Sequence, residues 1–149
     1  MADSGTLKST MRSRGASHML TGIHASDPLV LAERVREGLP FRTFELFADR
    51  SGFGLLRVAT LIDLPARTLA RRRSAGRLSA NESDRLMRLA RVFGLAIDLF
   101  EGDVEKARQW FERPQRGLAD IAPAAASRTD VGAREVEQLI GRLEHGVVS

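Results

Sequence analysis

The stretch FGLLRVATLIDLPARTLARRRS, residues 53–74, decides the fold of this chain. Its apolar spacing predicts a helix over about 53–62, a tight break at Asp63-Leu64, and a second helix over about 65–74 that opens on proline. Two helices joined so closely need a small residue where they cross and apolar residues that seal the turn. The residues at those places are Ala59, Leu64 and Leu69. The pattern predicts a helix-turn-helix unit, with aspartate at the break where glycine is usual.

Basic residues cluster on and just after the second of these helices. The cluster supplies more than the whole net charge of +4 and consists of Arg67, Arg71, Arg72, Arg73 and Arg77. On a helix, Arg67 and Arg71 share one face while Leu69 points the other way. An arginine fork can pair with guanine in the major groove, so we expect Arg67 and Arg71 to contact bases. We expect phosphate contacts from Thr68, Arg72, Arg73 and Arg77.

The alternative interpretation of this cluster is a solvated helix face. Of the 23 basic residues, all but Lys8 and Lys106 are arginine, which is typical of a GC-rich coding bias. That bias explains the choice of arginine over lysine, but it does not explain why five arginines gather in one place. A local surplus of positive charge indicates an anionic partner, most simply a phosphate backbone.

The segments before this unit predict an arm and two further helices. Residues 1–26 show no helical or strand period and are expected to form a flexible N-terminal arm. Asp27-Pro28 is a helix-start signal, and a short helix should run from there to about residue 37. A second, Phe-rich helix over about 41–48 should end at the Ser-Gly turn that follows.

The segments after it predict three more helices. Ser79 and Glu82 form a capping box, and an apolar stripe follows over about 79–100. This stripe should pack the core, and it could continue into a partner subunit. A helix over about 104–113 is capped by Asp103, and a loop with at most one turn follows. Thr129 caps a last helix that ends near His145 and has as its predicted buried edge Val136, Leu139, Ile140 and Leu143.

Composition favours helices and excludes several kinds of site. Aromatic residues make up 5% of the chain, which suits helix packing better than a sheet, so the fold class we predict is all-α. Without cysteine there is no disulfide or thiolate site, and the three histidines lack metal-ligand spacing. We therefore expect no enzyme activity, no metal and no cofactor. The chain lacks a membrane-spanning apolar run and is expected in the cytoplasm.

Two motif sets, in the expected order, resemble one known family. LPARTLARRRSAGRLSANESDRLMRLARV resembles the helix-turn-helix region of Xre-type antitoxins, and AIDLFEGDVEKARQWFERP resembles the element that follows it in that family. Further matches to the Xre/MbcA/ParS toxin-binding domain are Leu118, Pro123, Thr129, Gly132, Ala133, Val136 and Gly146. The resemblance covers about residues 38–149. It departs from the family pattern at Gln115 and Asp120.

The resemblance implies a Cro/Xre-like helix-turn-helix domain followed by a small helical toxin-binding domain. We place the DNA-binding and dimerisation domain at 27–100 and the toxin-binding domain at 101–149. The implied function is to neutralise an NAD-consuming RES-domain toxin by occluding its active site, and to repress the operon as a homodimer. The residues expected toward the toxin are Trp110, Arg142, His145, Gly146, Val147, Val148 and Ser149. For Trp110, core packing is the competing interpretation.

A different class of function also fits the residues. The chain could be a stand-alone dimeric repressor whose C-terminal unit serves only in dimerisation. The presence or absence of a toxic protein encoded next to it distinguishes that possibility from an antitoxin.

Overall fold

The computed structural model describes residues 17–146, and within that range helices form the fold. After a helical segment at 17–21, the elements are α2 (Pro28–Glu37), α3 (Phe41–Ser51), α4 (Leu55–Leu61), α5 (Ala66–Ala75), α6 (Ala80–Leu99), α7 (Val104–Phe111), the 3-10 helix η1 (Arg116–Leu118), α8 (Pro123–Ala126) and α9 (Asp130–Glu144). The described part contains two isolated β-bridges and no strand. The predicted all-α class is confirmed.

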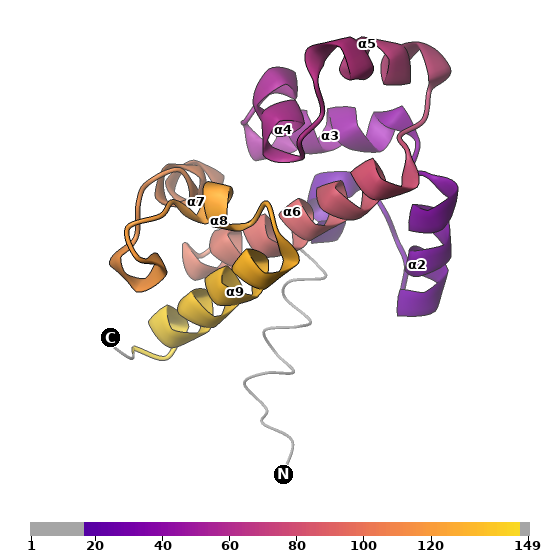
Figure 1. The fold of residues 1–149 in the computed structure, drawn as a ribbon. Coiled ribbons are helices and arrows are strands. Elements are labelled where there is room, and N and C mark those ends of the chain that lie inside the picture. Colours follow the sequence, from indigo (N-terminus) through magenta and orange to yellow (C-terminus); the bar gives the residue numbers. More distant parts are fainter. Residues whose placement is uncertain (1–16, 147–149) are drawn as a thin grey trace.

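Helix α6 is the axis on which the rest of the protein packs. The predicted capping box is present, with Ser79 Oγ accepting from the Glu82 backbone and the Glu82 carboxylate accepting from the Ser79 backbone. The predicted apolar stripe is buried over most of the helix. In Figure 1, α2 lies at one end of α6, and α7 and α9 lie along the other.

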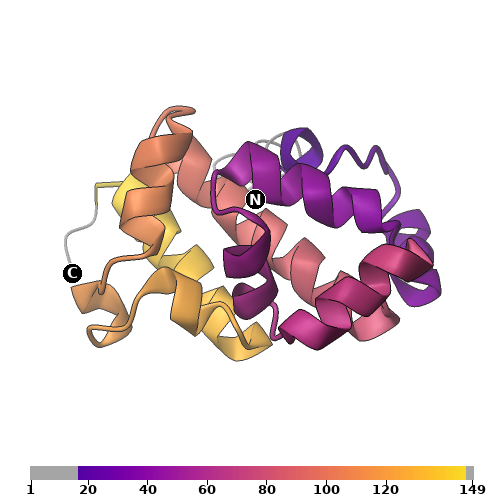
Figure 2. The same ribbon diagram turned by 90° about the horizontal axis from the view of Figure 1, so that it is seen from above.

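An aromatic cluster in the core joins the two halves of the chain. The Phe93 ring on α6 lies 4.9 Å from the Phe53 ring, 5.3 Å from the Phe111 ring and 6.4 Å from the Phe47 ring, measured between centroids. Phe47 and Phe53 come from the first half of the chain and Phe111 comes from α7. Seen from above in Figure 2, these elements pack side by side over α6. One continuous core therefore serves both halves.

The segment 17–26 differs from the predicted arm. Residues 17–21 are helical, Leu20 is fully buried, and Arg50 donates to the Met19 carbonyl. The prediction of a flexible arm is therefore wrong for 17–21, and residues 1–16 lie outside the described range. Five helical residues are too few to show a period in the sequence, and it is tertiary packing of one leucine that holds them.

The C-terminal elements follow the predicted order with one correction on α9. Asp103 and Thr129 cap α7 and α9 through their side chains, as predicted. The loop between these helices holds η1 and one short helical turn, α8. On α9 the buried edge stops at Ile140, because Leu143 is 43% exposed. Leu143 lies in the last turn of α9, beyond the last buried residue of this helix.

Candidate functional site

The break between α4 and α5 has the geometry that the sequence predicts. The Leu64 backbone N–H donates to the Ala59 carbonyl at 2.8 Å, which closes the turn tightly. Ala59, Leu64 and Leu69 are all buried beneath the two helices. With its inner face sealed in this way, α5 has a fixed orientation and presents its outer face to solvent.

Arg67 and Arg71 are exposed on the outer face of α5, opposite buried Leu69. Thr68 is half-buried between them. Arg73 is exposed, and its guanidinium lies 5.8 Å from the centre of the Phe41 ring, a distance at which cation and ring attract each other. The arrangement can present several guanidinium groups to one groove of DNA, but contact with DNA remains a prediction for each of these residues.

Arg72, a predicted phosphate contact, also pairs with a carboxylate of this chain. Its Nε donates to Glu82 Oε1 at 2.8 Å and its Nη2 donates to Oε2 at 3.2 Å. The Glu82 side chain is 7% exposed and is held in place by the capping box. Arg72 therefore ties the end of α5 to the start of α6. Its side chain is still 27% exposed, so a phosphate contact stays a prediction. The spacing in the sequence did not predict this pair, because it assigned Glu82 only to the capping box.

The same pair makes stability depend on pH. Burial by itself raises the pKa of Glu82, but hydrogen bonds from Arg72 and from the Ser79 backbone outweigh it, so the net pKa lies below its ordinary value. A carboxyl whose pKa is lower in the folded state stabilises the fold above its unfolded pKa of about 4.3. That contribution is lost as the pH falls through the lower, folded pKa.

We expect the stability of E82Q to depend less on pH, at acid pH, than the stability of the unaltered chain. Glutamine keeps the capping acceptor and loses the titrating charge, so the variant should be less stable than the unaltered chain at pH 7. The difference should shrink as the pH falls below about 4. Thermal denaturation followed by circular dichroism from pH 7 to pH 3 measures it, with E135Q on the exposed side of α9 as control. Parallel profiles for E82Q and the unaltered chain would contradict the assignment.

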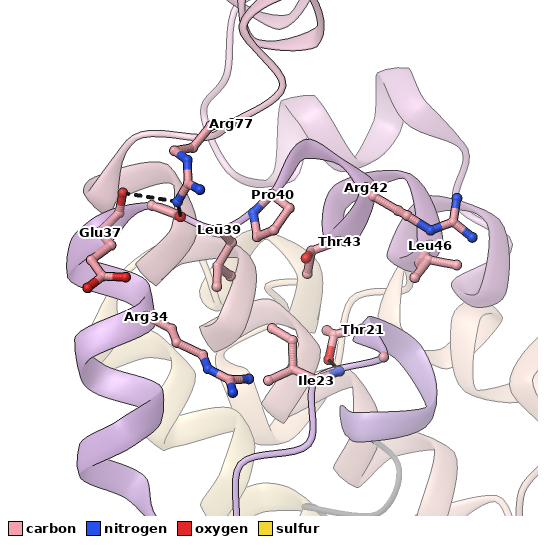
Figure 3. A pocket seen from close by; sticks show the side chains of 12 residues that line it. Thr21, Ile23, Arg34, Glu37, Leu39, Pro40, Arg42, Thr43, Leu46 and Arg77 are labelled. Carbon is pink, nitrogen blue, oxygen red and sulfur yellow. Dashed lines mark hydrogen bonds between the residues drawn. The ribbon is translucent and has the colours of Figure 1, made fainter.

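Arg77 lies at the rim of a pocket between α2, α3 and the segment 21–23. The pocket has a volume of about 480 Å³ (Figure 3). The Arg77 guanidinium donates to the carbonyls of Glu37 and Gly38, which holds the chain between α2 and α3 against the end of α5. Arg34 and Arg42 also line the pocket. The predicted phosphate contact of Arg77 thus competes with a structural role, although the residue is exposed.

The residues predicted to face a toxin lie on α7 and at the end of α9. Trp110 is half-buried and packs against the Phe100 ring, with centroids 6.1 Å apart, so part of it serves the core. Arg142 is half-buried, while His145 and Gly146 are exposed at the end of α9. Val147, Val148 and Ser149 lie outside the described residues.

Three large apolar side chains of this C-terminal half are exposed, and the most exposed of them is Val131 at 73%. Leu143 is 43% exposed beside Arg142, and Ile121 in the loop before α8 is 48% exposed. Leu143 was assigned to the core because it continues the apolar period of α9. Only the arrangement of neighbouring elements shows that they leave it 43% exposed. Arginine, the type of residue beside Leu143, is enriched at protein interfaces.

The described part of the chain has neither a metal-binding cluster nor a membrane-spanning helix. Residues 17–146 contain no group of three or more His, Cys, Asp or Glu side chains placed to hold a metal ion. None of the helices in that range is long and apolar enough to cross a membrane.

Comparison with known proteins assigns both halves of the chain. Residues 30–91 match the antitoxin Xre-like helix-turn-helix domain, and residues 95–146 match the antitoxin Xre/MbcA/ParS C-terminal toxin-binding domain. An antitoxin Xre of Photorhabdus laumondii is 41% identical over 116 residues, which cover 77% of this chain and 78% of that protein. The chain belongs to the antitoxin Xre family. An antitoxin Xre of Yersinia enterocolitica is 37% identical over 129 residues, covering 86% of this chain and 87% of that protein.

Membership of the antitoxin Xre family confirms the predicted resemblance and the order of the two domains. The two matches meet inside α6, between residues 91 and 95. We predicted the boundary at residue 100, where this helix ends. A boundary inside a continuous buried helix fits the shared aromatic core, since neither half packs without α6.

Proposed function

We propose that this chain is an antitoxin that neutralises a cognate NAD-consuming RES-domain toxin by covering the toxin's active site. We further propose that it represses its own operon as a homodimer, with Arg67 and Arg71 contacting bases. Family membership supports the two general activities, binding of DNA and binding of a toxin. The RES chemistry follows from the resemblance of the sequence alone.

The observation that carries the proposal is the separation of the two candidate surfaces. Helix α5 and the last turn of α9 lie at opposite ends of the molecule in both views (Figures 1 and 2). A toxin held at the end of α9 therefore leaves the outer face of α5 open. One chain could in this way occlude a toxin and bind DNA at the same time.

A protein that blocks an active site needs a complementary shape and favourable contacts with that site, and it needs no catalytic groups of its own. The end of α9 offers an exposed leucine, Leu143, flanked by Arg142 and His145. After the helix ends at Glu144, the sequence continues with His145, Gly146, Val147, Val148 and Ser149. A short apolar tail on a rigid helix is suited to entering a cleft, because the helix is already ordered before binding.

We expect deletion of residues 147–149 to abolish neutralisation and to preserve repression. The deletion leaves α9 and the two residues after it, His145 and Gly146, intact, so the fold should be unchanged. The test is to express the variant with the toxic protein encoded next to it, and to measure growth and cellular NAD. A reporter fused to the operon's own promoter measures repression in the same cells.

The matched control is the double variant R67A/R71A, which should neutralise the toxin and fail to repress. Full neutralisation by the truncated chain would show that the tail is not needed and that neutralisation depends on another surface. If no neighbouring protein is toxic or copurifies, the stand-alone repressor becomes the correct function.

A further inference from the structure

The turn that precedes the DNA-facing helix has an unusual residue at its bend. Asp63 has φ of 56°, in the left-handed region where glycine is the ordinary choice. Aspartate is among the few other residues that adopt this conformation, though less readily than glycine. Because Arg67 lies four residues further on, the backbone at Asp63 sets the direction in which α5 leaves the turn.

The Asp63 carboxylate is held from the other half of the chain. Its partner is the guanidinium of Arg128, which is 65 residues away in the sequence. Asp63 belongs to the segment that matches the helix-turn-helix domain, and Arg128 belongs to the segment that matches the toxin-binding domain. The pair therefore joins the two domains at the turn that orients α5.

Arg128 stands on a rigid support. It lies between α8 and α9, where Thr129 Oγ1 accepts from the Gly132 backbone at 3.0 Å. A Cβ on Gly132 would lie 1.8 Å from the Ala126 carbonyl oxygen, so the two helices approach as closely as only glycine allows. Ser127, next to Arg128, is buried. The guanidinium thus extends from a fixed backbone toward the turn.

Two further ion pairs cross the same boundary between the domains. Arg57 on α4 pairs with Glu112 at 2.8 Å, and Arg91 on α6 pairs with Glu137 on α9 at 2.7 Å. These pairs join helix surfaces. Among the inter-domain ion pairs of the described residues, the Asp63–Arg128 pair alone reaches the bend between α4 and α5.

We propose that Arg128 of the toxin-binding domain is a positioning residue for operator binding, because it holds the Asp63 turn in the conformation that presents Arg67 and Arg71 to DNA. This inference rests on the proposed operator binding. The pair is about half-exposed, and such pairs are worth at most about a fivefold change in an equilibrium. The observed affinity falls in proportion to the fraction of molecules whose turn holds the binding conformation, so the loss is at most about fivefold.

The test is a double-mutant cycle on operator affinity. We measure binding of the unaltered chain, R128Q, D63G and R128Q/D63G to duplex DNA from the operon's promoter by fluorescence anisotropy. R128Q should weaken binding about threefold to fivefold. D63G should bind within about twofold of the unaltered chain, because glycine adopts this φ without help. In the D63G background, R128Q should have no further effect.

Two controls separate positioning from other roles of Arg128. E137Q breaks the Arg91 pair in the same inter-domain boundary away from the turn, and it should bind DNA within about twofold of the unaltered chain. The dependence of affinity on salt should keep its slope in R128Q, since a residue that contacts no phosphate releases no counterion. Thermal denaturation confirms that each variant is folded at the temperature of the assay.

The inference is overturned if R128Q binds as tightly as the unaltered chain, or if its loss persists unchanged in the D63G background. An equal loss of affinity in E137Q would also overturn it. The loss would then come from weaker packing between the two domains in general and not from the Asp63 turn. A salt slope lowered by about one would instead make Arg128 a direct phosphate contact. If the unaltered chain binds no promoter DNA, the proposed repression fails, and this inference fails with it.

Discussion

Replacing Arg67 and Arg71 together by alanine should weaken operator binding by about 30-fold or more. Each arginine that pairs with a base contributes roughly 1–3 kcal/mol, and 1.4 kcal/mol is a factor of ten in affinity. Both side chains are exposed on the outer face of α5, so their removal leaves the buried scaffold of Ala59, Leu64 and Leu69 in place. The fold should therefore be retained, and the loss should be confined to DNA binding.

The matched control for this variant removes the same charge elsewhere. R113A/R116A takes two exposed arginines from the segment after α7, which lies away from α5, and should change affinity by less than about threefold. Anisotropy titrations at several salt concentrations give both quantities. Equal losses in the two double variants would show that binding responds to total charge, and the assignment of Arg67 and Arg71 to base contacts would be wrong.

Truncation of Phe93 should have the largest effect on the fold itself. Its ring is fully buried between Phe47, Phe53 and Phe111, and Phe→Ala changes at such positions cost about 3–5 kcal/mol of unfolding free energy. Because these neighbours come from both halves of the chain, F93A should weaken operator binding and toxin neutralisation together. Unfolding of the unaltered chain should be a single transition.

Urea denaturation followed by circular dichroism and by Trp110 fluorescence checks this expectation. The control is L143A, whose half-exposed side chain should cost less than about 1 kcal/mol. Two separate transitions in the unaltered chain, with F93A shifting only one of them, would show that the halves unfold independently. The shared core would then contribute little to the coupling between them.

The helix starts could be predicted because their signals are local. Asp27, Ser79, Asp103 and Thr129 each accept a hydrogen bond from the first turn of the helix that follows, as their positions before apolar periods indicate. The seal beneath α5 was predictable for the same reason, since Ala59, Leu64 and Leu69 lie within eleven consecutive residues.

The roles of individual arginines could not be predicted in this way. Arg71 and Arg72 are neighbours in one basic run, yet the first is exposed and the second is bound to Glu82. The direction of α6 relative to α5 decides between them, and no pattern within α5 contains that information. The same holds for Leu143, which continues the apolar period of α9 and is nevertheless 43% exposed.

The sequence by itself determined that this protein is an all-α member of the antitoxin Xre family, with a helix-turn-helix unit before a second helical unit. Periodicity, caps and motif order carry that information, because each depends on residues close together in the chain. Only the tertiary structure decided which side chains of the two units meet. The Asp63–Arg128 pair and the Phe93 cluster join segments far apart in the sequence, and such contacts exist only once α6 has brought both halves to one core.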